Sequence, residues 1–227
     1  MRETFVRGLA QLQDELLNLG SMVEEALDAS LEALRRRDLA AAQRIIQSDC
    51  FINEKRFAIE SEALVLIATQ QPMAGDLRTI AAVLEICTEL ERIGDYAKGI
   101  ARICLRLGEQ PPVKPLVDIP QMAARARAML REALDAFVRR DADAARAIPR
   151  QDDEVDALYN RVYRELLDII IADPTTIDRA TLLLWVAHNL ERTADRVTNI
   201  CERVVFTVTG ELGEMDVREE GICGMAG

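Results

Sequence analysis

Apolar residues recur along the N-terminal segment in alternating steps of four and three, which predicts a long amphipathic helix. The pattern runs from Phe5 to Ala33 and stops at the polar run Arg35–Asp38. Arginines suit the negative C-terminal end of a helix, and Asp38 suits the N-cap of the next one. By the same reasoning, two further helices are predicted over about 39–69 and 76–107.

A proline-rich segment interrupts the helical pattern at the midpoint of the chain. Three prolines within residues 111–115 mark a linker. Beyond it, helices are predicted over about 120–140, 142–172 and 176–209, with a kink at Pro149 in the second of them. The remaining residues show no period, and we expect a loose tail. The predicted units are a first bundle over 1–108, a linker over 109–118, a second bundle over 119–210 and a tail over 211–227.

The two halves resemble each other in sequence as well as in length. Leu34–Ala42 matches Phe137–Ala145, and Leu90–Asp95 matches Leu190–Asp195. A duplicated unit of three antiparallel helices accounts for these matches. The predicted fold is therefore all-α, with two tandem, pseudo-symmetric three-helix bundles of up-down topology. One continuous six-helix bundle is the alternative, and the proline-rich linker disfavours it.

Composition narrows the function classes. Aromatic residues make up 4% of the chain and hydrophobic residues 49%, which favours long helices over a β-sandwich. The net charge of −11 argues against a nucleic-acid-binding protein. The uncharged runs are too short to span a bilayer, and five cysteines without a CxxC motif favour a reducing, cytoplasmic location. Cys87, Cys104 and Cys201 are expected to be core thiols.

A repeated Glu-Arg-x-x-Asp motif is the main candidate for chemistry. It pairs Glu91 with Asp95 in the first half and Glu191 with Asp195 in the second. Carboxylates four residues apart lie on one helix face and repel each other. A cation held between them is a physical reason for such a pair, although acidic pairs on a solvent-facing helix surface are also common.

An earlier helix in each half offers further oxygen atoms. Asp49 and Asn53 precede the first motif, and Asp152 and Asp156 precede the second. Their distance along the chain is about the path down one helix and partway up the next, so the two segments can face each other. Four oxygen-bearing side chains in each half suit iron, manganese, magnesium or zinc.

The acidic pairs are predicted to point away from the apolar stripe, toward the outer surface of the bundle. This separates them from a buried ferritin-like di-iron centre, which requires Glu-x-x-His motifs. The single histidine, His188, lies one turn before Glu191, where it either joins that site or makes an ordinary hydrogen bond. Without a nucleophile–base pair or a nucleotide-binding loop, the sequence does not indicate an enzyme.

These motifs, in this order, resemble the PhoU family. The resemblance runs from about Thr4 to about Gly210. It is carried by Asp49-x-x-Ile52-Asn53, Gln71-Pro72-x-Ala74-x-Asp76-Leu77-Arg78, Leu90-Glu91-Arg92-Ile93-Gly94-Asp95-Tyr96-Ala97, Asp152-x-x-Val155-Asp156 and Leu190-Glu191-Arg192-Thr193-Ala194-Asp195-x-x-x-Asn199-Ile200.

The resemblance implies a cytoplasmic, often dimeric, negative regulator of phosphate uptake and of the phosphate-starvation response. Such proteins link the ATPase subunit of a phosphate ABC transporter to a sensor histidine kinase, and they carry surface clusters of iron or zinc on their acidic motifs. Asn53 and Gly99 stand in the first half where the second half has Asp156 and Asn199. Asn199 is thus a further potential ligand, and we expect weaker or different metal occupancy in the first half.

Two rival interpretations remain open. One is a carboxylate-bridged metal protein with a redox or storage role, which predicts buried ligands. The other is a metal-free helical scaffold, which predicts that removing either aspartate of the motifs is harmless or mildly stabilising.

Overall fold

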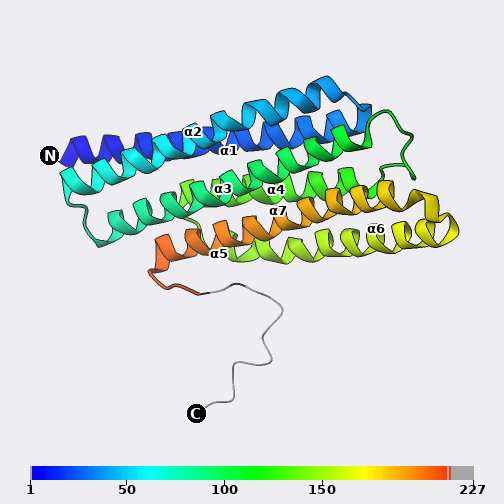
Figure 1. Ribbon diagram of the computed structural model, residues 1–227. Coiled ribbons are helices and arrows are strands. Elements are labelled where there is room, and N and C mark those ends of the chain that lie inside the picture. Colours follow the sequence, from blue (N-terminus) through cyan, green and yellow to red (C-terminus); the bar gives the residue numbers. More distant parts are fainter. Residues whose placement is uncertain (1, 214, 216–227) are drawn as a thin grey trace, which may run out of the picture.

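The protein is built from long helices that lie side by side (Figure 1). The computed structural model describes residues 2–213 and 215, and no strand occurs among them. The all-α prediction is confirmed. The first half contains α1 (Arg2–Arg36), α2 (Leu39–Gln70) and α3 (Ala74–Leu107). The second contains α4 (Asp118–Arg139), α5 (Ala142–Ala147), η1 (Ile148–Gln151), α6 (Asp152–Ala172), η2 (Pro174–Thr176) and α7 (Ile177–Thr209).

Two aspartates define equivalent corners in the two halves. The Asp38 carboxylate accepts a hydrogen bond from the Ala41 N–H at 2.8 Å, and Asp141 accepts one from the Ala144 N–H at 2.9 Å. Both are N-caps, as predicted for Asp38. The predicted fifth helix is divided, because the 3₁₀ turn η1 around Pro149 separates α5 from α6.

The two halves meet along α3 and α7, which run antiparallel. Arg203 on α7 lies 2.8 Å from Glu85 on α3, and Asn199 donates a hydrogen bond to Glu89 at 3.2 Å. Further along, a side chain at Gly99 would come within 3.2 Å of Asn189.

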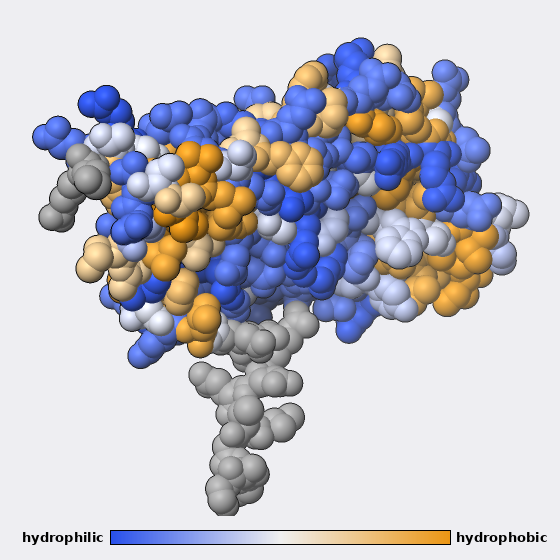
Figure 2. All heavy atoms as spheres, turned by 60° about the vertical axis from the view of Figure 1, so that its left-hand side comes forward, coloured by the Kyte–Doolittle hydropathy of each residue, from blue (hydrophilic) through white to orange (hydrophobic). Residues whose placement is uncertain are grey.

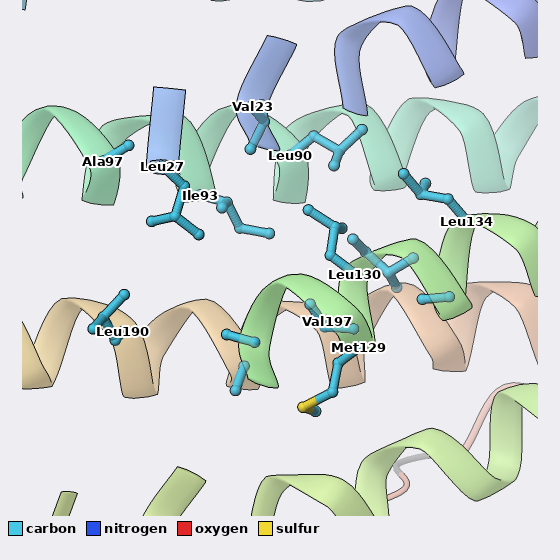
Figure 3. Close-up of a cluster of buried hydrophobic side chains, with 14 of the residues drawn as sticks. Val23, Leu27, Leu90, Ile93, Ala97, Met129, Leu130, Leu134, Leu190 and Val197 are labelled. Atoms are coloured by element: carbon cyan, nitrogen blue, oxygen red, sulfur yellow. The ribbon is translucent and has the colours of Figure 1, made fainter. Parts of the chain in front are cut away.

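Figure 3 shows the apolar side chains that fill the space between the halves. Leu90 and Ile93 come from α3, Leu190 and Val197 from α7, and all four are fully buried. The buried apolar residues of both halves form one continuous cluster. The three-helix units are therefore joined by a shared core as well as by the linker.

The cysteines lie where the sequence indicates. Cys87, Cys104 and Cys201 are buried free thiols, while Cys50 is exposed. Cys223 and most of the predicted tail lie outside the described residues. Over the part of the chain that is described, no helix is both long and apolar enough to cross a membrane.

Candidate functional site

The acidic motif of the first half meets α2, as its spacing predicts. Gly94, inside the motif, allows the close approach, because a Cβ atom there would lie 3.1 Å from the Cδ1 atom of Ile52 on α2. The contact brings Asp49 on α2 next to Glu91 and Asp95 on α3. We call these three residues the first carboxylate cluster.

A lysine lies between members of the first carboxylate cluster. The Nζ atom of Lys98 is 2.5 Å from Asp49 Oδ2 and 3.5 Å from Asp95 Oδ1. The side chain of Asp49 is only 8% exposed, so its charge needs a close partner. The Asn53 amide also donates to Asp49 Oδ2 at 3.2 Å. Asn53 therefore supports Asp49 from the same helix.

An arginine lies next to Glu91, the remaining carboxylate of this cluster. Arg56 Nη1 lies 3.6 Å from Glu91 Oε2, and Arg56 Nε donates to Glu60 at 2.8 Å. Burial raises the pKa of Glu91, and the charges of Asp95 and Asp49 raise it further, while Arg56 lowers it. The first cluster is thus enclosed by two cations from α2 and α3.

The second half brings the equivalent carboxylates together with different neighbours. Glu191 and Asp195 lie on α7 and face Asp152 at the start of α6, and we call these the second carboxylate cluster. Burial raises the pKa of Glu191 to about 6, and the charges of Asp195 and Asp152 add to this effect. Arg192 lowers it, and its Nη1 atom lies 2.6 Å from Asp195.

Two side-chain oxygen atoms of α7, one on Glu191 and one on Thr198 a turn after Asp195, are buried without a hydrogen bond within the described residues. They are Oε2 of Glu191 and Oγ1 of Thr198. His188 Nδ1 lies 3.5 Å from that glutamate oxygen, and the imidazole packs edge-on against Trp185. A buried carboxylate oxygen without a hydrogen bond is a suitable acceptor for a cation, which makes the second cluster the candidate metal site.

Two other predicted ligands lie at the margin. Asn199 is occupied across the interface, where its amide donates to Glu89 of α3. Asp156 lies one turn after Asp152 on α6 and is partly exposed. No three His, Cys, Asp or Glu side chains in residues 2–213 and 215 already converge tightly enough to hold a metal.

The outward direction predicted for the motifs holds in part. Asp95 is 51% exposed, but Glu91 is only 16% and Glu191 only 18% exposed. The prediction treated each helix alone, whereas α2 and α6 cover the glutamates. The clusters thus lie at the edges between helices, with one aspartate toward solvent.

Sequence reasoning did not identify Lys98 and Arg56 as part of the first cluster. An alignment of the two halves could have identified them, because the equivalent positions in the second half are Thr198 and Tyr159. Two cations in one half that become neutral residues in the other are visible once the halves are aligned.

Glu191 makes the stability of the metal-free protein depend on pH. Its raised pKa means that the folded state holds the proton more tightly than the unfolded state between about pH 4.5 and pH 6. Its contribution to stability is therefore lost as pH rises through this window. We expect Glu191→Gln to stabilise the protein by about 2 kcal/mol at pH 7.5.

Urea unfolding in a chelator checks this expectation. The advantage of Glu191→Gln should disappear at pH 4. Glu154→Gln is the matched control, since Glu154 is exposed on α6. An equal advantage at both pH values would show that burial of the Glu191 charge is not its cause.

Comparison with known proteins gives consistent matches over most of the chain. A family model described as the PhoU domain matches residues 16–104 and again 119–204. A Clostridium acetobutylicum protein named phosphate-specific transport system accessory protein PhoU homolog is 38% identical over 211 residues, covering 92% of this chain and 96% of the relative. A Caulobacter vibrioides protein of the same name is 40% identical over 204 residues, covering 89% of each.

A solved structure agrees with the fold. The crystal structure of the phosphate transport system regulatory protein PhoU from Streptococcus pneumoniae superposes with a TM-score of 0.86 at 34% identity. The match covers 92% of this chain and 99% of that one.

Proposed function

Because this chain belongs to the PhoU family, we propose that it regulates phosphate transport as an accessory protein that docks on partners and catalyses no reaction. The observation that carries the proposal is the double match to the PhoU domain, which spans both halves. Relatives named as accessory proteins of the phosphate-specific transport system align over nearly the whole chain.

We propose that the partners are the ATPase subunit of a phosphate ABC transporter and a sensor histidine kinase, both met in the cytoplasm. In this role the protein restrains phosphate uptake and the starvation response when phosphate is plentiful. A docking role is supported by large exposed apolar side chains along α2, and Figure 2 shows apolar patches separated by polar surface on one face of the molecule. These α2 residues are Phe51, Phe57, Leu64 and Val65. A second copy of the chain is a further proposed partner.

We further propose that the second carboxylate cluster binds a transition-metal ion, iron or zinc, with manganese or magnesium as alternatives. Asp152, Glu191 and Asp195 would hold it. A bound divalent ion supplies positive charge to a site that burial has made unfavourable for carboxylates. The raised pKa of Glu191 and its buried oxygen support this assignment.

Complementation tests the regulatory role. In a bacterium that lacks its own PhoU homologue, we expect a phosphate-starvation reporter to be active in rich phosphate. Expression of this chain should restore repression and lower phosphate uptake. Immunoblotting confirms expression, and purified chain should bind the purified ATPase subunit and the cytoplasmic part of the kinase. Full expression without repression or binding would contradict the proposal.

A further inference from the structure

The two carboxylate clusters occupy equivalent places in a duplicated fold, but their neighbours differ. In the first cluster, Lys98 reaches from α3 to Asp49 on α2 and also faces Asp95 on its own helix. The contact to Asp49 crosses between helices, so Lys98 lies where ligands from both helices converge.

Because Asp49 is buried, its ion pair with Lys98 differs from an ion pair on the protein surface. Lys98 is 20% exposed and Asp49 only 8%. An ion pair with this little solvent around it is not screened as exposed pairs are, and each charge depends on the other.

A metal ion at the first cluster would have to approach the oxygens that Lys98 already contacts. The Arg56 guanidinium stands beside Glu91, so the third carboxylate also faces a cation. A divalent ion placed among these groups would be repelled by both. The residues of the first cluster therefore do not fit the metal that the fold family implies.

The second half lacks both of these cations. Thr198 and Tyr159 stand at the positions of Lys98 and Arg56. Arg192 pairs with Asp195, whereas its equivalent, Arg92, turns away to Glu89 at 3.1 Å. The Thr198 hydroxyl is a buried oxygen without a hydrogen bond among the described residues, at the place where the first half has an ammonium.

We propose that Lys98 is a built-in counter-cation that takes the place of a metal ion in the first carboxylate cluster, so that this half is held together without metal. The two clusters then differ in where their cations lie. In the first, the Lys98 ammonium bridges carboxylates of two helices, whereas in the second Arg192 pairs with Asp195 on its own helix. The inference concerns the first half alone and does not require that the second half binds metal.

The test measures metal binding at the first cluster alone. Glu191→Gln and Asp195→Asn together form the background, in which the second cluster is disabled. Zinc binding to the purified, untagged protein is measured by calorimetry and elemental analysis. With Lys98 present, we expect no stoichiometric zinc. Lys98→Thr combined with Arg56→Tyr, which installs both residues of the second half, should admit one zinc ion and raise its affinity by about 100-fold or more, because both opposing cations are gone. Lys98→Thr alone should give part of this gain in affinity.

Stability gives a second measurement on the same variants. In a chelator, Lys98→Thr should melt at a lower temperature because Asp49 is left buried without its cation, and zinc should restore the melting temperature. Adding Asp49→Asn should restore it without zinc. If Lys98→Thr folds poorly, Lys98→Gln keeps a long polar side chain and carries the same zinc expectation.

Lys55→Thr is the matched control, because Lys55 also joins two helices, through Glu15 on α1, but lies outside the cluster. It should gain no zinc. Two results would overturn the inference. They are stoichiometric zinc in the first cluster while Lys98 is present, and no gain of zinc after Lys98 is removed in a folded protein.

Discussion

Leu190→Ala is expected to lower the free energy of unfolding by about 3 kcal/mol. Leu190 is fully buried between the halves, immediately before the acidic motif of α7. Alanine removes the atoms that fill this space and leaves a cavity that rigid helices on both sides cannot close. Leu90→Ala, at the equivalent place on α3, should cost a similar amount.

The form of the transition is as informative as its midpoint. Since the buried residues of both halves form one cluster, both variants should unfold in a single cooperative step that far-UV circular dichroism and Trp185 fluorescence report together. Leu64→Ala is the control, because Leu64 is 60% exposed on α2 and should cost less than about 0.5 kcal/mol. Two separate transitions would mean that the halves are energetically independent.

Asp195→Ala is expected to remove the metal from the protein, while Asp95→Ala leaves the metal content unchanged. In the second cluster, loss of Asp195 takes away an oxygen next to the buried oxygen of Glu191, and affinity should fall by about 100-fold. In the first cluster, Lys98 already balances the carboxylates, so no bound ion is lost. Elemental analysis of untagged protein measures both variants beside the native chain.

The same analysis separates the rival functions. A storage or redox protein would bind many ions per chain or turn over peroxide, and Asp195→Ala would abolish that turnover. A metal-free scaffold would contain no stoichiometric metal even after reconstitution, and Asp195→Ala would then be neutral or slightly stabilising. One ion that disappears only in Asp195→Ala would leave the proposed regulator as the interpretation that accounts for all variants.

Much of the fold could be predicted from the sequence, because long helices have a recognisable apolar period and recognisable capping residues. The apolar steps from Phe5 and the aspartates at 38 and 141 mark helix bodies and starts that local chemistry determines. The antiparallel contact of α3 with α7 was not accessible in this way. It depends on which buried faces of the two halves fit together, and both faces carry the same kind of apolar pattern.

The candidate site, like the fold, could be predicted from the sequence only in part. Spacing predicted that the two acidic segments of each half can face each other, and the structure places Asp49 near Asp95 and Asp152 near Glu191, since helix length and turn position determine both. It did not predict that Lys98 lies between the first pair, or that Asn199 crosses to Glu89. A long, flexible side chain can reach several nearby partners. Which partner it contacts depends on residues of neighbouring helices, and the apolar period of one helix gives no information about them.

The contact between α3 and α7 also bears on how the duplicated chain could have arisen. Glu89 faces Asn199, and the repeat-related residues Asn189 and Gly99 face each other in the same way. Each side of this interface thus presents the same helix to the other, as in a dimer with a twofold axis. A half-length ancestor that paired with itself would have had two identical clusters. A single chain is free of that constraint, and here lysine stands on one side where threonine stands on the other.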